Sequence, residues 1–348
     1  MTGPAFTILH HLDGDPLDRP SREVYAEVLE HIILADELGF DTVWFAEHHA
    51  AQGGRLPWPL LFIIQAAERT QHVTLGTGVT LLPFYHPLAV AEQIAEADIL
   101  TNGRFAVGFG SGSAPVDFGA FGVVPSQKGE RLQEGLEVLL RLWAGETVTY
   151  HGRHYDITGA QLFPTPERPA RDIAWLAAGH PFTAGLAGAH NLHLMLARGT
   201  PTNDAQTLIA AYHAALAAHG HSAADRRIQR TWMVYVDETD AAARAAIAPS
   251  ADFYYQQTLA MGRPRLPNER DLDARLAFID ALVGSPETVA HELAARASEL
   301  GLTDIALHTR MARVSHAANL RSTALLAERV FPLVRELWPV PVGPQERQ

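Results

Sequence analysis

Segments with the pattern of a strand alternate with segments with the pattern of a helix along most of this chain, and this alternation is the feature that most constrains its fold. Short runs rich in Val, Leu, Ile and Phe are each followed by a longer amphipathic stretch, and the early runs begin roughly 30 residues apart, the length of one βα unit. Parallel strands need a crossover between them, so the pattern predicts a parallel sheet covered by helices. The predicted strands are residues 6–10, 42–46, 73–80, 105–109, 173–177, 193–197, 231–236 and 303–308.

Strands separated by helices, without a Gly-rich linker that would divide the chain, predict an α/β fold. The pattern favours a closed (β/α)8 TIM barrel over two doubly wound domains. Ser21 is expected to be the N-cap of the first helix, because its hydroxyl can accept from a free N–H of the first turn. The predicted helices are residues 21–38, 59–69, 87–100, 127–143, 204–218 and 286–300.

The chain is longer than a minimal barrel. Such a barrel needs about 250 residues, so about 100 of the 348 residues are left for inserted segments. We expect one barrel domain over residues 1–338, with insertions near 112–126, 147–166 and 248–273, and a C-terminal tail at 339–348. The insertion near 147–166 has the pattern of a hairpin that turns at Gly152, and the insertion near 248–273 is a candidate lid.

Composition and charge exclude several classes of function. The chain has no cysteine, which excludes disulfides, thiolate nucleophiles, Cys-ligated zinc and iron–sulfur clusters. A formal net charge of −12 argues against general binding to nucleic acid or to an anionic membrane, because such binding depends on concentrated Lys and Arg. No apolar run approaches the length of a membrane-spanning helix, and the N-terminus lacks the pattern of a signal peptide, so we expect a cytoplasmic protein.

Polar residues and glycines gather where the predicted strands end. Because the C-terminal ends of barrel strands meet at one mouth, we predict that these groups surround one site. The run 108–112 lacks the Gly-x-Gly-x-x-Gly and Lys-Ser/Thr patterns of nucleotide loops, and its glycines would let a flat ring lie against the backbone. The groups at strand ends are His10 and His11, Glu47-His48-His49, Gly76-Thr77-Gly78, residues 108–112, and Gly179 with His180.

Several stretches of the chain follow the order and spacing of a known family. The stretches are Gly39-Phe40-Asp41-Thr42-Val43-Trp44 with Glu47-His48-His49, Gly76-Thr77-Gly78 leading through Leu82-Pro83 to His86-Pro87, Gly103-Arg104-Phe105 leading to Gly108-Phe109-Gly110, and Val283-Gly284-Ser285-Pro286-Glu287-Thr288-Val289. In this combination the chain resembles the bacterial luciferase-like flavin-dependent monooxygenases, and in particular the luciferase α subunit. The resemblance implies a (β/α)8 barrel that uses reduced FMN as a cosubstrate or, in some branches, the deazaflavin F420.

The resemblance also implies roles for residues after the second and third strands. His48 matches a histidine that lies beside the flavin ring and assists oxygen chemistry at a C4a-peroxyflavin, with Glu47 and His49 on its flanks. An imidazole near neutrality can exchange a proton there, and a carboxylate can fix its tautomer. An ion pair at the barrel rim is the alternative for Glu47. Gly78 and Val79 match a non-proline cis peptide under the flavin ring, and a β-bulge is the alternative.

The loop after the fourth strand departs from the family pattern. Many relatives have an arginine there that binds the flavin phosphate, whereas this chain has Ser111 after Gly110. The usual charge-assisted contact is therefore missing, and its absence predicts weak binding of FMN.

Other positions are candidates to replace the missing phosphate contact. Backbone amides near Gly179 and His180 precede a helix whose N-terminus favours an anion, and Thr183 adds a hydroxyl. Arg198, just past the sixth strand, is the nearest candidate cation. A pairing with a rim carboxylate is the alternative role of Arg198.

These features together predict a two-component flavin monooxygenase. A separate reductase would deliver reduced FMN, which fits the lack of a nicotinamide-binding fingerprint, and O2 would meet a small organic substrate in a pocket lined with aromatic side chains. The alternatives are an F420-dependent oxidoreductase of the same family, a non-catalytic flavin-binding barrel and a metal-dependent barrel hydrolase. The hydrolase would have His-x-His after the first strand, where His10 and His11 are adjacent instead, and we expect no metal site.

Two of the predicted helices carry apolar stripes. Related barrels pair through these helices, so the resemblance predicts a homodimer, and the alternative is that both stripes only cover the barrel. The stripes consist of Leu60, Ile63, Ile64 and Ala67 in residues 59–69, and of Leu88, Ala91, Ile94 and Ala95 in residues 87–100.

Overall fold

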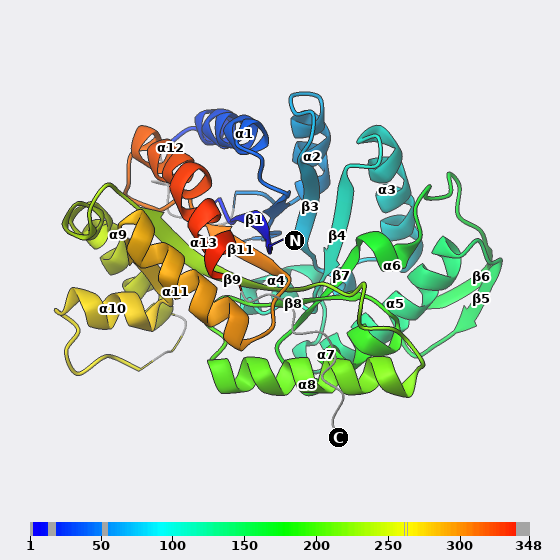
Figure 1. Ribbon diagram of the computed structural model, residues 1–348. Helices are drawn as coiled ribbons and strands as arrows, with labels where there is room; N and C mark the ends of the chain where they lie inside the picture. The colour runs from blue at the N-terminus through cyan, green and yellow to red at the C-terminus, as the bar shows by residue number, and fades with distance from the viewer. Residues whose placement is uncertain (1–2, 13–18, 51–54, 261, 263, 339–348) are drawn as a thin grey trace, which may run out of the picture.

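Parallel strands close into a barrel in this structure, a computed structural model that describes residues 3–12, 19–50, 55–260, 262 and 264–338. The eight strands follow the order β11-β1-β2-β3-β4-β7-β8-β9, and β9 pairs with β11 to complete the ring. Figure 1 shows the strands near the centre of the molecule with helices around them. The TIM barrel predicted from the sequence is confirmed. The strands are β1 (Ala5–His10), β2 (Thr42–Phe45), β3 (Thr74–Thr80), β4 (Phe105–Phe109), β7 (Ala174–Ala178), β8 (His193–Leu196), β9 (Ile228–Val236) and β11 (Asp304–His308).

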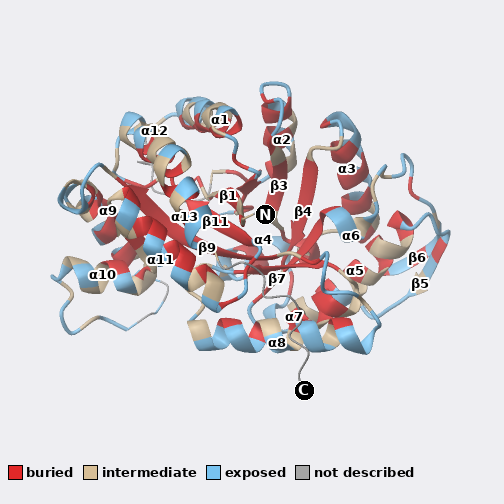
Figure 2. Cartoon of the chain, viewed as in Figure 1, coloured by how far each residue is buried: buried red, intermediate tan, exposed pale blue. Residues whose placement is uncertain are grey.

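Helices cover the outside of the barrel. Figure 2 shows strands that are buried along most of their length and helices that are buried on one side only. Both faces of the strands are covered, so most strand residues are apolar, although buried polar residues such as Thr77 of β3 and Gln229 and Arg230 of β9 occur among them. The helical elements are α1 (Ser21–Glu37), α2 (Pro59–Ala67), η1 (Leu82–Phe84), α3 (Pro87–Leu100), α4 (Pro115–Phe121), η2 (Pro125–Gln127), α5 (Lys128–Trp143), α6 (Ala170–Ile173), α7 (Pro181–Ala189), α8 (Thr202–Ala218), α9 (Asp240–Ala260), α10 (Leu272–Phe278), α11 (Pro286–Glu299), α12 (His316–Leu325), η3 (Leu326–Val330) and α13 (Phe331–Leu337).

Two local features differ from the sequence prediction. β10 (Ala281–Gly284) is an additional strand that pairs in parallel with β9 outside the ring, and its shortness hides it among the helical patterns on either side. Ser21 is the first residue of α1 and not its N-cap. Pro20 occupies the cap position, and no side chain caps this end of the helix. The backbone therefore enters the helix one residue earlier than the hydroxyl pattern indicates.

The segment 248–273, expected to be an insertion and a candidate lid, is helical over its first half. α9 continues through Pro249. Ile247, Ala251 and Tyr254 are buried in a cluster with apolar residues of β9 and β10, and we attribute the continuity of α9 to this packing, which opposes the helix-breaking tendency of proline. Residues 264–271, between α9 and α10, contain neither helix nor strand.

The two other expected insertions contain short elements. α4 and η2 lie within residues 112–126, and β5 (Val148–His151) pairs with β6 (Asp156–Ala160) as the predicted antiparallel hairpin. The predicted tail at 339–348 lies outside the described residues. Within the described part of the chain, no helix combines the length and the apolar character that a membrane crossing requires.

The apolar stripes predicted to form a homodimer face are largely buried within the chain itself. Side chains that pack against their own barrel cannot contact a second copy, which weighs against a dimer face built from both stripes, and the homodimer itself stays a prediction. Leu60, Ile64 and Leu88 of the stripes are only partly buried. Trp58 and Leu61, beside and on α2, lie outside the stripes and are 42% and 76% exposed. The buried stripe residues are Ile63, Ala67, Ala91, Ile94 and Ala95.

Charged pairs occupy the N-terminal end of the barrel. Arg227, just before β9, donates from Nε to Oδ2 of Asp304 at 3.0 Å, and Asp304 is fully buried at the start of β11. Arg168 donates from Nε to Oδ1 of Asp98 at 3.0 Å in a similar pair. Burial raises the pKa of Asp304 in spite of the Arg227 guanidinium. The Arg227 guanidinium therefore stabilises the negative charge of Asp304 at a buried position that disfavours a charge.

Candidate active site

A cavity of about 450 Å³ lies among the C-terminal ends of the strands. This volume is within the range of sites for small molecules and cofactors. His49, His180 and Thr183, which were predicted for the site, do not line it. The predicted residues that line it are Glu47, His48, Gly78, Val79, Gly110, Ser111, Gly179 and Arg198.

Glu47 is buried, and its carboxylate is held by neighbouring donors. Its Oε1 atom lies 2.7 Å from the hydroxyl of Tyr85, 3.0 Å from Nε2 of His49 and 3.3 Å from the backbone nitrogen of Leu81. Burial and the Glu47 carboxylate raise the pKa of Tyr85, so this hydroxyl keeps the proton that it donates. Glu47 thus ties the end of β2 to the segment after β3. This geometry matches the rim pairing given as the alternative for Glu47.

His49 points away from the cavity. Its ring lies edge-on to Phe121, with centroids 4.8 Å apart, and to Trp58 at 5.7 Å. His48 lines the cavity and His49 does not. The role predicted for His49 beside the reaction site stays a prediction.

His48 faces a second imidazole. Its Nε2 atom lies 3.3 Å from Nδ1 of His11, directly after β1, and the two rings stack with centroids 5.7 Å apart. His308, at the end of β11, stacks on His11 at 5.3 Å. β11, β1 and β2 are neighbours in the barrel, so three adjacent strand ends bring three imidazoles together. Sequence analysis placed His11 at the mouth but did not pair it with His48.

β3 contributes Gly78 and Val79 to the cavity. The peptide bond between them is cis, as the resemblance implied. The pairing of β3 with β4 also shifts in register between Thr77 and Thr80. The two alternatives given for this position therefore occur together.

Two glycines near the cavity are required by close packing within the protein. An added Cβ at Gly110 would lie 2.3 Å from Cγ2 of Val79, and one at Gly108 would lie 2.7 Å from the carbonyl of Thr77. Close approach of neighbouring atoms explains these glycines, and the predicted contact with a flat ring stays a prediction. Gly179 differs from them, since an added Cβ would meet no atom within 4 Å. At Gly179 the backbone borders open space.

Lys128, the first residue of α5, brings a cation to the loop after β4. Its Nζ atom donates to the carbonyl of Gly112 at 3.1 Å, and Lys128 lines the cavity together with Ser111. Sequence analysis missed this residue. A signal existed, because Lys128 is the only lysine in the chain. Nothing local in the sequence connects it to Ser111.

Asp117 of α4 is a second residue of the cavity that sequence analysis missed. It is 2% exposed, and its Oδ1 atom has no hydrogen-bond partner among the described residues. Leaving a buried carboxylate oxygen without a donor costs free energy, which a donor from a ligand would recover. The insertion near 112–126 thus contributes a polar group to the cavity wall.

His180 and Thr183 lie at the start of α7. Nδ1 of His180 accepts from the backbone N–H of Phe182 at 3.1 Å and so caps this helix. The cap satisfies one of the free N–H groups of the first turn. The His180 ring is therefore bound to its own helix. Gly179, which precedes His180, borders the cavity.

Arg198 points toward β9 and α9. Its Nη1 atom is 2.7 Å from Sδ of Met233, and its guanidinium lies over the ring of Tyr254 at 5.6 Å. Among the described residues Arg198 forms no ion pair with a carboxylate, so the alternative role given for it is not observed. Its charge borders the cavity and remains available to an anion.

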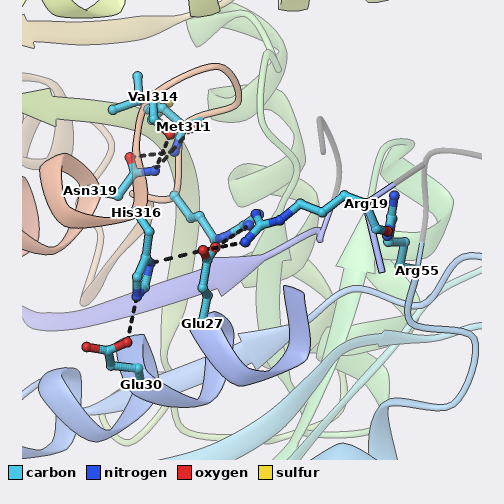
Figure 3. Close-up of polar contacts among 9 residues, drawn as sticks. Arg19, Glu27, Glu30, Arg55, Met311, Val314, His316 and Asn319 are labelled. Atoms are coloured by element: carbon cyan, nitrogen blue, oxygen red, sulfur yellow. Dashed lines mark hydrogen bonds and ion pairs between the residues drawn. The ribbon is translucent and has the colours of Figure 1, made fainter. Parts of the chain in front are cut away.

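Charged residues form a network at the rim of the mouth near β11. Glu27 of α1 is bound by Arg19 and lies 3.4 Å from Nη2 of Arg310, while His316 of α12 is 2.9 Å from Glu30 (Figure 3). Partial burial opposes the charge of Glu27, but the hydrogen bond from Arg19 and the neighbouring cations lower its pKa overall. This network connects α1, the segment before it, and the loop between β11 and α12.

Two further histidines, His10 and His31, are buried beside each other. Among the described residues, no group of three or more His, Cys, Asp or Glu is arranged to hold a metal. Both ring nitrogens of His10 lack a partner in the described part of the chain, and the ring packs edge-on to His31 at 5.0 Å. Burial lowers the pKa of His10, and it lowers that of His31 to about 3. Both rings are therefore neutral near pH 7.

The structure is a closed parallel barrel with a cavity at its C-terminal mouth. Apolar side chains, imidazoles and cations line this cavity. This is the architecture of a barrel enzyme. The sequence profile of the family described as luciferase-like monooxygenase matches residues 5–304. The chain belongs to this family of enzymes, as its resemblance to the luciferase α subunit indicated.

Known relatives include an oxygenase and an F420-dependent enzyme. Limonene 1,2-monooxygenase of Rhodococcus erythropolis is 30% identical over 316 residues, which are 88% of this chain and 80% of the relative. F420-dependent glucose-6-phosphate dehydrogenase of Amycolatopsis mediterranei is 33% identical over 169 residues, 47% of this chain and 50% of the relative. The chain spans about half the length of several curated relatives that it matches.

The fold is also that of a solved flavin enzyme. The oxygenating constituent of 3,6-diketocamphane monooxygenase of Pseudomonas putida, in complex with FMN, matches with a TM-score of 0.81 and 20% identity. The match covers 95% of this chain and 99% of that one. At this identity the likeness concerns the fold alone.

Proposed function

We propose that this protein is a flavin-dependent monooxygenase that binds reduced FMN in its barrel mouth and uses O2 to oxygenate a small organic substrate. The observation that carries the proposal is the set of residues that line one cavity. His11 and His48 follow β1 and β2, whereas Ser111 and Lys128 come from the loop after β4 and the start of α5. An imidazole can exchange protons near neutral pH, and a lysine beside backbone amides can bind a phosphate. FMN combines a reactive ring with a phosphate.

The lining residues suit this cofactor. Leu9, Val79 and Met195 offer apolar contacts to a ring, and Gly179 leaves space beside the backbone. Lys128 and Ser111 would hold the phosphate, with Arg198 as a further cation on the side of β9. When bound, reduced flavin supplies the electrons that activate O2.

The chain's own residues would then control protons and water. His48 would exchange a proton with the reacting oxygen, a role that contributes typically 10²–10⁴-fold to rate. Glu47 would position the end of β2, because its Oε1 is already engaged by Tyr85, His49 and Leu81. The apolar walls and α4 would limit access of bulk water to the site.

We further propose that a separate reductase supplies the reduced flavin. The sequence has no nicotinamide-binding fingerprint, so this chain would receive FMNH2 rather than reduce FMN itself. The F420-dependent relative favours a second candidate, hydride transfer with F420 on the same barrel.

Cofactor titration separates the two candidates. We expect reduced FMN to bind, and FMNH2 with O2 to yield an oxygenated product, while F420 shows no saturable binding in the same assay. Ligand binding is followed by flavin or deazaflavin fluorescence under anaerobic conditions. Saturable F420 binding without FMNH2 binding would replace the first candidate by the second, and binding of neither would reject both.

We also propose a homodimer that pairs through the outer face of α2. Leu61 and Trp58 are large apolar residues exposed there. Leu61→Asp should convert a dimer into a monomer without unfolding it, as measured by light scattering at micromolar concentration. A monomeric wild-type protein would reject the dimer.

A further inference from the structure

The imidazole of His11 faces His48 from the neighbouring strand, and the proposed function gives it no role. We propose that His11 is the positioning residue of His48, and that the two rings share one proton, which fixes the nitrogen that His48 presents to the cavity. This inference rests on the proposed role of His48 as the proton-exchanging group.

The contact between the rings limits how many protons they can carry. Nδ1 of His11 and Nε2 of His48 are 3.3 Å apart, which leaves room for one hydrogen between them. Two neutral rings satisfy this contact when one donates and the other accepts. If both rings were cationic, two N–H groups would point at each other and two like charges would be adjacent. The pair should therefore take up one proton readily and a second only at lower pH.

The same contact determines which atom of His48 remains for chemistry. Because Nε2 is turned to His11, Nδ1 is the other ring nitrogen, and it has no hydrogen-bond partner among the described residues. His48 lines the cavity. We infer that a proton reaches a ligand through Nδ1 of His48. His11 then takes or returns a proton at Nε2 of His48, on the far side of the His48 ring. The charge of the pair then changes by one unit when one proton passes to the ligand.

His11 is itself held from a third strand. His308 stacks on it at 5.3 Å, and Nε2 of His308 lies 3.0 Å from the carbonyl of Arg310 and 3.3 Å from the hydroxyl of Tyr254. Arg310 also contacts Glu27 of the rim network. The described groups around the pair include His308 and Arg310 from the β11 side and Tyr254 from α9, which contacts His308, together with His10 next to His11 and Glu47 next to His48 in the chain. None of these contacts requires a ligand, so the pair is formed in the free protein.

Two substitutions distinguish sharing of a proton from simple packing. His11→Phe keeps an aromatic ring in the stack between His48 and His308 but removes the nitrogen that faces His48. His11→Gln keeps a polar group that can hydrogen-bond but does not titrate. His213→Gln, on an exposed position of α8, is the matched control for removal of a histidine.

The primary readout is the titration of the His48 ring in protein without flavin, followed by nitrogen and proton NMR of the imidazoles. In the wild type we expect His48 to titrate in two steps that are shared with His11. His11→Phe and His11→Gln should reduce this to one step, with a midpoint displaced by about one pH unit or more, the scale of interacting sites. The His213→Gln control should titrate as the wild type does. Independent single-step titrations of His11 and His48 in the wild type would overturn the proposal.

Turnover with supplied FMNH2 is the second readout. Both His11 variants should lower kcat by about tenfold or more with little change in KM, a smaller loss than the roughly 10²-fold expected for His48→Gln. The His11→Gln, His48→Gln double variant should be no slower than His48→Gln alone, because both changes interrupt one unit. Full activity of His48→Gln would reject the proposed function of His48, whereas full activity of the His11 variants beside an inactive His48→Gln would reject only the role of His11.

Discussion

Two buried carboxylates at opposite ends of the barrel differ in how they are paired. At the N-terminal end, both oxygens of the Asp304 carboxylate accept from Arg227. At the C-terminal mouth, His48 faces another imidazole, and Asp117 keeps a buried oxygen that has no described partner. A charge that is paired within the chain gains little from a ligand, whereas an unpaired acceptor can gain a hydrogen bond. This difference fits the general pattern of TIM barrels, in which the C-terminal mouth carries the chemistry and the opposite end maintains the fold.

The largest effect should come from breaking a pair at the N-terminal end. Arg227→Ala leaves the fully buried Asp304 without its guanidinium partner, and we expect the free energy of unfolding to fall by about 3–5 kcal/mol. The pKa of Asp304 is already raised by burial and should rise further, so the carboxyl stabilises the fold when protonated and loses this contribution as pH increases. The deficit should therefore be smaller at pH 5 than at pH 8, as measured by denaturant unfolding.

The control for this variant is Arg171→Ala, whose side chain is 62% exposed. It should change stability by less than about 0.5 kcal/mol. The surviving folded fraction of Arg227→Ala should keep its turnover. A loss of stability no larger than that of the control would show that the pair does not hold this end of the barrel.

A substitution at the mouth should have the opposite effects, a large loss of activity and little loss of stability. His48→Ala should reduce oxygenation by about 10²-fold or more, equivalent to about 2.7 kcal/mol of barrier, because a positioned acid or base is lost. Stability and flavin affinity should stay close to the wild-type values. Steady-state turnover with excess reduced FMN, beside a denaturant curve, measures both. If turnover persists while stability falls, the two ends do not divide the roles as proposed.

A smaller effect is expected at the phosphate side of the cavity. One charge-assisted contact is worth about 1.5–3 kcal/mol, or roughly ten- to a hundredfold in affinity. Lys128→Met should weaken FMN by this factor and leave riboflavin unchanged, and Ser111→Arg should tighten FMN. Arg198→Ala tests the cation proposed on the side of β9 in the same way. Without the usual arginine, we expect the wild-type protein to purify largely colourless.

Parallel titrations of each variant with FMN and riboflavin provide the measurement. Equal losses for the two ligands would show that the substituted side chain does not contact the phosphate. A yellow wild-type protein with tightly bound oxidised FMN would contradict the prediction of weak binding.

The smallest effect is expected in the rim network of Figure 3, which lies at the mouth but is paired like the opposite end. Glu27→Gln should cost about 1 kcal/mol or less, because its partners are partly exposed and screened by salt. The pKa of Glu27 is lowered in the fold, so its contribution is present above about pH 4.5 and is lost as pH falls below that value. The difference from the wild type should therefore shrink in acid and in high salt, as measured by thermal unfolding. A difference that persists under both conditions would point to packing instead of charge.

The fold was predictable because its signal is local and repeated. Each strand and helix carries its own pattern, and the succession of such units leaves few topologies besides a barrel. The incorrect predictions of secondary structure occur where tertiary packing overrides the local preference of the sequence. Pro249 lies inside α9 because Ile247 and Tyr254 are buried beside it, and β10 is too short to be recognised without its partner β9.

The site was predictable only in part. His48 could be placed at the mouth because it follows a strand, and every parallel strand of a barrel ends at the same face. His49 is adjacent in sequence yet lies against Phe121 and Trp58, whereas Glu47, on the other side of His48, also lines the cavity. No local sequence pattern predicts which of two adjacent histidines faces the cavity.

The sequence by itself therefore determined the barrel, the end at which the polar residues gather and the position of Glu47-His48-His49 within it. The tertiary structure alone decided that His48 meets His11, and that Lys128 reaches the loop of Ser111. The physical reason is that periodicity records which face of an element is buried, whereas a contact between side chains depends on the register of separate strands and on the direction of each side chain.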